Sequence, residues 1–421
     1  MFIWTRLRRF IRSQYPALAF KNYRYFFNAS LGSVGATQLT QMGQGWLIYE
    51  LSNSALMLGI LGFCIAFPNL VVNLPGGVFA DRLNKKHLLA ITNVVNGAVV
   101  FLLAVLVLLD LTQVWHVLLS AAVISAVNGL DWPVRVSIYP HLVPRDGYLS
   151  AIALNSFLWQ ITRMVIPAIG GYILQFLGNG WLFLFCAAGF ITMTITMCLL
   201  RIEHTPVVSQ SSPLADLIEG VKFVAVQPLF RYLLLLTFVG MLFCNSHVQI
   251  MPIFAELVGG SETAFGMLLA SGGLGAIIGA TIIGSARRLA QVGVVLTSTG
   301  LLSIILTFGF AVVAHLGFFI PALILQFACA AFATMFVISV LTVLQLRVPN
   351  RLRGRVMGIQ TMGFSLIPLG GLFIGYLVEL STVIIAMAIG CGIYALVLLA
   401  VMYRRRDIRS LNSSQLSEAQ I

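Results

Sequence analysis

Polar side chains recur at helical spacing in an otherwise apolar stretch near the start of the chain. The stripe consists of Ser30, Ser33, Thr37, Gln41 and Gln44. Intervals of three or four residues place them on one face of a helix. Hydroxyl and amide groups can hold a polar organic solute, and a lipid-facing helix does not carry five of them in line. We therefore expect the stripe to line a cavity, with Thr37, Gln41 and Gln44 contacting substrate; hydrogen bonds between helices are the alternative.

A shorter polar stripe occurs in the second half of the chain. Asn245 and Gln249 are one helical turn apart and accompany Phe238 and Met241. Amides, an aromatic ring and methionine suit a moderately polar, partly aromatic solute. His247 lies between them and titrates near neutral pH in its ordinary state, so it is a candidate for proton coupling. A structural role for this histidine is the alternative.

Three charged residues lie in apolar stretches. Asp131 and Arg135 are four residues apart, so they can pair on one helical face as a proton-sensitive gate or as a static ion pair. Arg163 is about 18 Å along its predicted helix, where a charge costs at least about 2.5–3.5 kcal/mol. It must face a cavity, where it would bind an anionic or electron-rich solute, or a partner such as Asp131.

The composition defines the elements that must position these residues. Hydrophobic residues make up 59% of the 421 residues, charged residues 9%, and the mean hydropathy is +0.97. This is too apolar for a soluble domain or a disordered chain. Stretches of about 20 residues can each cross a bilayer as a helix, which predicts an all-α membrane protein. Twelve such spans are predicted at 26–49, 55–79, 88–109, 115–138, 151–177, 180–200, 229–254, 263–285, 289–312, 316–344, 356–378 and 382–402.

The net charge of +12 is distributed as an orientation signal. If the spans alternate, every Lys and Arg outside them falls on one side. The opposite loops carry only acidic charges, at Glu50, Asp110, Glu256, Glu262 and Glu379. Basic loops stay inside, so both termini are predicted to be cytoplasmic, and no nucleic-acid partner is expected.

The two halves of the chain resemble each other. Val143-Pro144 recurs as Val348-Pro349, and Ile166-Pro167 with Gly170-Gly171 recurs as Ile367-Pro368 with Gly370-Gly371. Six spans plus six with internal similarity is a common plan of secondary transporters. The predicted domains are a basic arm (1–25), a first six-helix bundle (26–200), a linker with an interfacial helix (201–228), a second six-helix bundle (229–403) and a tail (404–421).

The loop after the second span carries a recognisable motif, in which Gly77, Asp81, Arg82, Lys85 and Lys86 follow in order. It resembles the loop between spans 2 and 3 of the major facilitator superfamily, with Asn84 in place of a second glycine. We expect Asn84 to replace that glycine because it tolerates left-handed backbone. The resemblance implies a twelve-helix fold of two pseudo-symmetric bundles. It also implies that Asp81 latches the bundles against a helix N-terminus, worth about 0.3–2 kcal/mol; a basic loop that only sets topology is the alternative.

The region from Asn128 to Gly171 is similar to the exporter branch of that superfamily, which contains drug/proton antiporters of the macrolide-efflux and enterobactin-exporter type. Ile166 stands where this branch has a glycine before the proline. The resemblance implies a proton-driven exporter of a drug, an antibiotic-like metabolite or a siderophore, in the inner membrane. A nutrient importer, a uniporter and a membrane sensor without transport are the alternatives.

Chemistry other than transport has little support in the sequence. There is no phosphate-binding GxxxxGK[ST] motif, no metal-ligand spacing and no nucleophile–base pair. The six cysteines all fall inside predicted spans, where packing is their expected role. We therefore expect no enzyme activity, cofactor or metal, and a monomer that contacts a small solute, protons and lipid.

Overall fold

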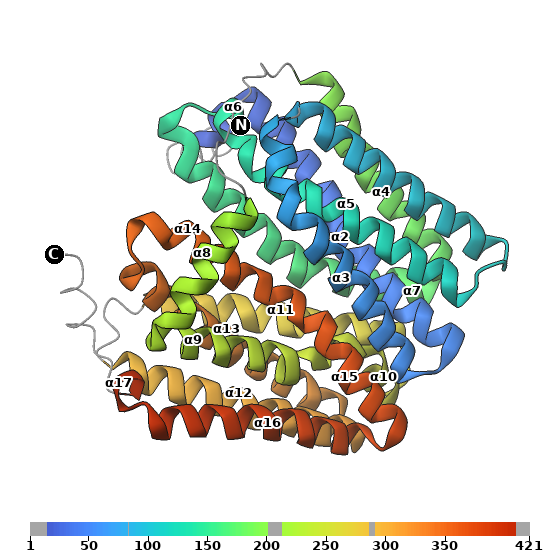
Figure 1. Cartoon of the computed structure of the whole chain (residues 1–421). Helices are drawn as coiled ribbons and strands as arrows, with labels where there is room; N and C mark the ends of the chain where they lie inside the picture. Colours follow the sequence, from blue (N-terminus) through green and yellow to red (C-terminus); the bar gives the residue numbers. More distant parts are fainter. Residues whose placement is uncertain (1–14, 83, 201–212, 286–290, 410–421) are drawn as a thin grey trace, which may run out of the picture. The chain divides into compact units, whose positions relative to one another are not determined.

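The computed structural model describes residues 15–82, 84–200, 213–285 and 291–409, without the side chains of 74–82, 213–216 and 406. The regular structure of these residues is helical, with no strand (Figure 1). Contacts divide the chain into two compact units, Met1–Gln44 with Pro68–Gln210, and Gly45–Phe67 with Ser211–Ile421. The second unit thus contains a short hairpin from the first half of the chain.

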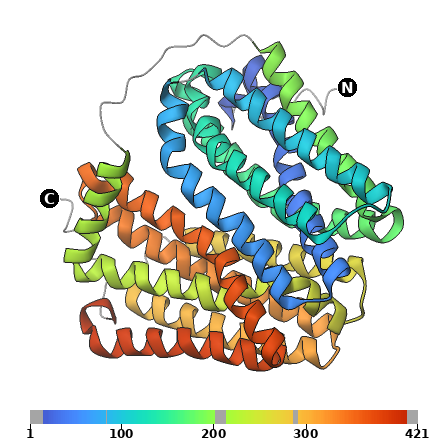
Figure 2. The same ribbon diagram turned by 45° about the vertical axis from the view of Figure 1, so that its right-hand side comes forward.

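The first unit is built on α4, which packs along α7 and α5 (Figure 2). Tyr23 and Phe26 are buried at the start of α2, where Phe26 meets the Tyr139 ring edge-on at 5.8 Å. The Tyr23 hydroxyl donates to the Ala151 carbonyl oxygen at 3.1 Å. Its helices are η1 (Pro16–Ala19), α2 (Lys21–Ser52), α3 (Ala55–Arg82), α4 (Lys85–Leu108), α5 (Val114–Ser137), α6 (Tyr139–Leu142) and α7 (Arg145–Leu199), with the hairpin ends of α2 and α3 belonging to the second unit.

In the second unit, α11 packs on α13, α13 on α12 and α12 on α16. The small residues Gly275 and Gly279 of α11 permit this closeness, because a Cβ on either would meet backbone atoms of α13. Its helices are α8 (Pro213–Val226), α9 (Pro228–Val239), η2 (Gly240–Cys244), η3 (Asn245–Ile250), α10 (Met251–Leu257), α11 (Glu262–Ser285), α12 (Val292–His315), α13 (Phe319–Arg347), α14 (Asn350–Met362), η4 (Gly363–Ser365), α15 (Leu366–Leu380), α16 (Val383–Arg404) and α17 (Arg406–Arg409).

One apolar stretch of the second unit, Pro228–Leu257, changes helical type along its length. It begins as the α-helix α9, becomes a π turn in η2 and a 3-10 helix in η3, and returns to α-helix in α10. π turns and 3-10 segments inside a helix often mark a functional site or hinge. The polar residues Asn245, His247 and Gln249 all lie in η3.

Ten helical segments of the described chain are long and apolar enough to cross a membrane. Eleven of the twelve predicted spans fall on these ten segments, because one segment holds two, and the remaining span falls on α2. The 55-residue α7 holds two predicted spans, separated at Gly178, whose backbone is not helical (φ 82°, ψ 173°). The 32-residue α2 holds the first span, and its polar stripe lowers its hydropathy.

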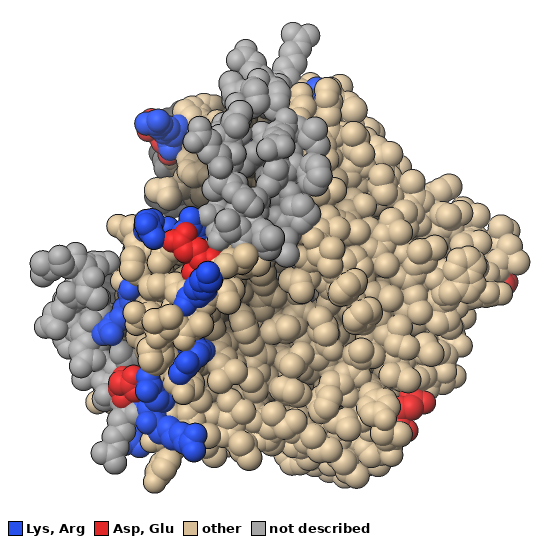
Figure 3. All heavy atoms as spheres, viewed as in Figure 1, with Lys and Arg blue, Asp and Glu red and all other residues tan. Residues whose placement is uncertain are grey.

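Basic side chains of the second unit gather at one end, over α8, α14 and α17 (Figure 3). They come from the end of α13, from α14 and from the end of α16, at Arg347, Arg351, Arg353, Arg355, Arg404 and Arg405. At the opposite end, the loops 258–261, 316–318 and 381–382 contain no Lys or Arg. The predicted surface helix is α8, which packs on α14 through Gly220 and pairs Glu219 with Arg351 and Arg355.

Candidate functional site

The charged pair in the first unit forms the centre of a buried polar network. Asp131 Oδ2 lies 2.9 Å from Arg135 Nε, one helical turn away on α5. Asp131 Oδ1 accepts hydrogen bonds from Thr92 Oγ1 at 2.9 Å and Asn93 Nδ2 at 3.0 Å, both on α4. All four residues are buried. A buried ion pair is stable only when further hydrogen bonds satisfy it, and α4 supplies those of the carboxylate.

The guanidinium of this pair is held by α2. Arg135 Nη1 donates to Ser30 Oγ and Nη2 to Ser33 Oγ, each at 3.2 Å. At the other end of the same stripe, Gln44 Nε2 donates to Ser120 Oγ of α5 at 3.0 Å. Three members of the stripe therefore join α2 to α5, which is the helix–helix alternative of the sequence analysis.

The middle of the stripe differs from its ends. Thr37 is half-buried and donates to the Ser33 carbonyl oxygen at 2.9 Å, within its own helix. Gln41 is exposed. Of the three cavity residues predicted on α2, Gln41 is thus accessible to a solute, Thr37 is partly accessible and Gln44 is enclosed between helices.

A buried phenol interacts electrostatically with the charged pair without bonding to it. Tyr139 begins α6, is buried, and its hydroxyl has no hydrogen-bond partner among the described residues. Burial raises the pKa of this phenol, and the positive charge of Arg135 opposes that rise. The phenol therefore stays neutral and leaves the Asp131–Arg135 charges balanced.

Arg163 lies within α7 and is not part of this network. Its side chain is exposed and forms no ion pair with any described residue, so the predicted neutralisation by Asp131 is absent from the described contacts. One turn earlier, Trp159 meets Trp132 of α5 edge-on, with ring centroids 5.3 Å apart. A cation and two indole rings are thus presented by adjacent parts of α5 and α7.

In the second unit, His247 is enclosed by hydrogen-bonding groups. Its Nδ1 is 2.9 Å from the Cys244 carbonyl oxygen and its Nε2 is 3.0 Å from Gln326 Oε1 of α13. The Phe310 ring of α12 lies 5.7 Å away. The ring is 2% exposed, so any proton it exchanges must arrive through these neighbours.

The other two polar residues of η3 have different surroundings. Asn245 is half-buried. Gln249 is also half-buried, and its Nε2 donates to the Leu58 carbonyl oxygen at 3.3 Å. A Cβ added to Gly371 would lie 2.4 Å from Gln249 Cγ. Gln249 therefore packs between α3 and α15, and its role as a substrate contact stays a prediction.

The hairpin Gly45–Phe67 is packed tightly into the second unit. A Cβ on Gly59 would lie 2.7 Å from Leu372 Cα, and one on Gly62 would lie 2.2 Å from the Pro368 carbonyl oxygen. Ser54 Oγ donates to Glu379 Oε2 at 2.9 Å. The Tyr49 hydroxyl donates to Glu256, and Trp46 stacks on Phe265 at 5.6 Å. The hairpin is thus joined to α10 by the Glu256 carboxylate, to α11 by the stacked ring of Phe265, and to α15 by glycine contacts and the Glu379 carboxylate.

The loop motif is described in part. Gly77, Asp81 and Arg82 lie outside the residues whose side chains the structure describes. Lys85 Nζ lies 3.3 Å from the Ser137 carbonyl oxygen and 3.4 Å from His141 Nε2, and Lys86 Nζ donates to the Cys198 carbonyl oxygen at 3.2 Å. These basic residues join the start of α4 to the ends of α5 and α7.

The expectation for Asn84 was wrong. Its backbone is extended (φ −66°, ψ 109°) and not left-handed. Its Oδ1 accepts from the backbone N–H groups of Lys86 and His87, so Asn84 is the N-cap of α4. Asparagine is among the strongest N-cap residues, and this role explains why it can stand where the motif has glycine.

Sequence reasoning missed the partners of the charged pair. Thr92, Asn93 and Asn96 are polar residues within one turn of an apolar span, which is the signal that could have found them. Asn96 Nδ2 donates to Asn128 Oδ1 of α5 at 3.0 Å and extends the network. The pairing of Tyr49 with Glu256 joins residues 207 positions apart, and no local pattern indicates it.

Comparisons with known proteins bear on this architecture. A family model described as "Transmembrane secretion effector" matches residues 12–420. The staphyloferrin A transporter of Staphylococcus aureus is 26% identical over 391 residues, which cover 90% of this chain and 95% of the relative. The enterobactin exporter EntS of Shigella boydii is 29% identical over 292 residues, 68% of each chain.

Solved structures share the fold. A bacterial homologue of the lysosomal transporter Spinster, in an inward-facing conformation, superposes with a TM-score of 0.66 at 17% identity, covering 95% of this chain and 97% of its own. The nucleoside transporter NupG superposes with a TM-score of 0.65 at 16% identity, covering 90% and 98%.

Proposed function

Because the chain belongs to the transmembrane secretion effector family of the major facilitator superfamily, and is therefore a multi-pass membrane protein, we propose that it exports a small organic molecule by alternating access. The proposed substrate is an anionic iron chelator. Two relatives are named for siderophores, which supports this class. The observation that carries the proposal in this chain is Arg163, an exposed residue within α7 whose guanidinium forms no ion pair with any described residue.

A charge on a membrane-spanning helix is costly unless it faces water, a partner or a ligand. Arg163 has no charged partner among the described residues, so water or a ligand must solvate it. Guanidinium groups bind carboxylates and other oxygen anions through paired hydrogen bonds. Trp159, one helical turn before Arg163 on α7, and Trp132, whose ring it meets, offer apolar ring surface, and Gln41 of the same unit offers an exposed amide. This combination favours an anionic solute with a carbon framework or aromatic rings. The half-buried Thr37 of α2 is proposed to contact the same solute, and the substrate roles of Gln44, Asn245 and Gln249 stay predictions.

The orientation is proposed from charge. Basic residues at one end of the second unit and acidic ones at the other favour cytoplasmic termini in an inner membrane.

The chain is proposed to act as a monomer, divided into two six-helix bundles at the linker 201–228. The loop motif of Gly77, Asp81, Arg82, Lys85 and Lys86 is proposed as the latch between conformations, and the contacts of Lys85 and Lys86 support an anchored start of α4.

Proton exchange is the proposed driving force. One charge crossing about 150 mV supplies about 3.5 kcal/mol, which sustains between two and three decades of solute gradient. Asp131 is the proposed proton carrier, with Arg135 as its partner and His247 as a second candidate. Protonation of Asp131 would release Arg135 and weaken the α2–α5 contact at Ser30 and Ser33, so the network couples a proton to a helix–helix interface.

The test is mass spectrometry of spent medium from cells with the wild-type protein, without it, and with Arg163→Gln, grown with and without iron. We expect an iron-chelating metabolite that is exported by the wild type and reduced at least tenfold by both changes. Arg163→Lys, which keeps the charge, should retain part of the export, and Arg351→Gln, which removes an exposed arginine of α14, should retain all of it.

Other results would point to other functions. Accumulation of a solute inside wild-type cells alone would indicate an importer. Export that persists when the proton gradient is collapsed would indicate a uniporter. Ligand binding to the purified protein with no flux in proteoliposomes would indicate a sensor. An exported metabolite that carries no anionic group would refute the assigned substrate class and leave the export function standing.

A further inference from the structure

Two arginines of the second unit share one aromatic ring. The guanidinium carbon of Arg231 lies 5.0 Å from the centroid of Tyr232, and that of Arg405 lies 5.0 Å from the same centroid. The two cations are therefore no more than about twice that distance apart, within the range of unscreened repulsion. Tyr232 lies on α9, and Arg405 directly follows α16. These two helices pack directly on each other.

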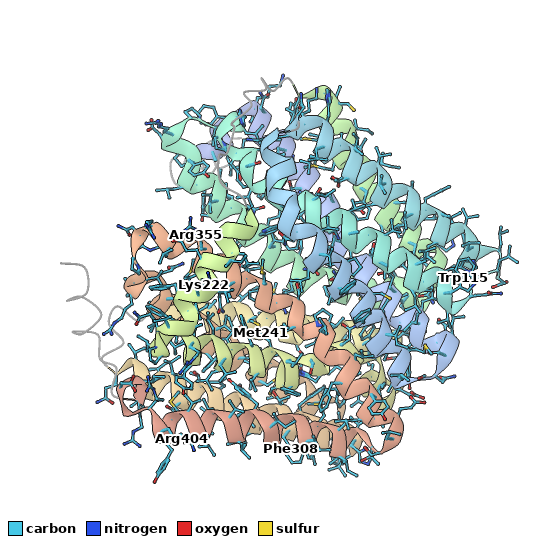
Figure 4. The ribbon with its side chains drawn as sticks, in the orientation of Figure 1. Trp115, Lys222, Met241, Phe308, Arg355 and Arg404 are labelled. Atoms are coloured by element: carbon cyan, nitrogen blue, oxygen red, sulfur yellow. The ribbon has the colours of Figure 1, made fainter. Side chains whose placement is uncertain are left out.

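Among the residues that the structure describes, Asp407 is the carboxylate that reaches this pair of cations. Asp407 Oδ1 is 3.5 Å from Arg405 Nε, but the contact lacks the geometry of a hydrogen bond, and this buried nitrogen has no hydrogen-bond partner among the described residues. Arg231 Nη1 donates only to the Ala225 carbonyl oxygen at the end of α8, at 3.3 Å. Arg404, labelled in Figure 4, adds a third exposed cation at the same end of α16.

The depth of the pair matches the headgroup region of a bilayer. Arg231 is in the first turn of α9, and Arg405 directly follows the last residue of α16. α9 begins the segment Pro228–Leu257, and this segment and α16 are each long and apolar enough to cross the membrane. Tyr403, 83% exposed, lies at the same level, and exposed aromatic residues are typical of the membrane interface.

Leucines are exposed further along the two spans that carry the arginines. Leu235 is exposed one turn further along α9, and Leu399 and Leu396 are exposed on the last turns of α16. A pair of cations at the headgroup level of two spans that expose leucines complements an anionic group that is joined to an acyl chain. Clusters of basic residues next to spans bind anionic lipids for the same reason.

We propose that Arg231, Tyr232 and Arg405 form a binding site for the phosphate of an anionic glycerophospholipid, whose acyl chain lies along α9 and α16. The Tyr232 ring holds both guanidinium groups in place, so that their planar donors can converge on phosphate oxygens. The lipid would stabilise the junction of α8, α9 and α16. This site is separate from Arg163 and the proposed substrate.

The experiment is native mass spectrometry of the purified full-length chain with added phosphatidylglycerol, phosphatidylcholine or inorganic phosphate. For the wild type we expect a bound phosphatidylglycerol fraction at least five times that of phosphatidylcholine, and a higher melting temperature with phosphatidylglycerol only. Arg231→Gln with Arg405→Gln should reduce the bound fraction at least fivefold. The matched control is Lys222→Gln with Arg351→Gln, which removes two cations at the same end of the unit and should change binding less than twofold.

Several results would overturn the site. Equal losses in the double variant and its control would show a diffuse charge effect. Inorganic phosphate that produces the same melting shift would show a free-anion site in place of a lipid site. If the glutamine variants do not fold, Tyr232→Leu keeps both charges and should still lower phosphatidylglycerol binding two- to threefold; unchanged binding in that variant would refute the role of the ring.

Discussion

The first helix of each half of the chain occupies the same place in the repeat, yet the two are built differently. α2 is one helix from Lys21 to Ser52, and its polar groups at Ser30, Ser33 and Gln44 bond to α5. Its counterpart, Pro228–Leu257, passes through a π turn and a 3-10 helix around His247. The first is a continuous α-helix with side-chain bonds to α5 near both ends of its polar stripe, whereas the second departs from α-helical geometry at its middle.

The neighbouring helices differ in the same way. Charge is concentrated in the first half, at Asp131 and Arg135; the positions 205 residues further on, by the spacing of Val143 and Val348, are the buried Phe336 and Val340. In the first half, a Cβ on Gly170 would meet side chains of α2. In the second, a Cβ on Gly370 would meet the backbone of η2. We infer that the first half carries the proton-sensitive contact and the second half the more deformable span.

The largest effect is expected from Arg135→Ala. It leaves the Asp131 carboxylate buried without its counter-charge, which costs about 3–5 kcal/mol. Val340→Ala at the corresponding place of the second half removes only apolar contacts and should cost clearly less. Denaturant titration of each variant in nanodiscs measures the two free energies of unfolding.

The double change of Arg135→Met with Asp131→Leu serves as the control, because it removes both charges and should recover much of the loss. A single Arg135→Ala variant as stable as Val340→Ala would show that the pair is not a buried charge centre, and the contrast between the halves would fail.

The second contrast uses the glycines that support the two spans. Gly370→Ala would place a Cβ 1.9 Å from the Leu242 carbonyl oxygen, and overpacking of this kind costs about 1–3 kcal/mol. Gly170→Ala meets Leu39 Cδ1 at 2.6 Å and Met42 Sδ at 2.8 Å, which are ends of flexible side chains, so its cost should be smaller.

Melting temperatures and export rates of the two variants give the comparison. Gly392→Ala is the control, since no atom lies within 4 Å of the added Cβ, and it should behave as the wild type. If Gly170→Ala proved as damaging as Gly370→Ala, the side chains of Leu39 and Met42 would not yield to the added Cβ, and the contrast between side-chain and backbone contact at the two glycines would fail.

The third contrast concerns protons. Asp131→Asn keeps the shape of the side chain and removes its charge, so we expect efflux to lose its acceleration by an inward proton gradient. His247→Gln should lower stability by about 1 kcal/mol, the net contribution of a hydrogen bond, and leave that acceleration in place. Efflux from proteoliposomes with and without an imposed pH gradient measures both.

Thermal unfolding of the two variants separates loss of coupling from loss of fold. The reverse result, with coupling lost in His247→Gln and kept in Asp131→Asn, would move the proton site to the second unit.

How much of this could be predicted from sequence depended on the range of the interactions. The helices follow from runs of apolar residues, and the surface helix α8 from local periodicity. The Asp131–Arg135 contact is also local, because four residues of α-helix bring the two side chains together. The stripe on α2 was visible, but which of its members face α5 depends on the rotation of one helix against another, which a single helical pattern does not contain. Similarly, the π turn in η2 arises where Gly370 brings α15 against it, a contact between distant parts of the chain.

The smallest effect is expected from Gln44→Leu. Compared with Gln41→Leu, it gives the most direct test of the polar stripe on α2. Gln44 loses a hydrogen bond to Ser120 between two helices, worth about 0.6 kcal/mol in membrane proteins. Gln41 has no such bond among the described contacts and is exposed, so its replacement should leave stability unchanged and instead raise the KM for the exported solute. Unfolding and concentration-dependent efflux, measured on both variants, separate the two roles. Equal KM values for Gln41→Leu and the wild type would remove Gln41 from the cavity and leave the α2 stripe as a purely structural contact, which would make Arg163 with its two tryptophans the remaining polar contact of the first unit with substrate.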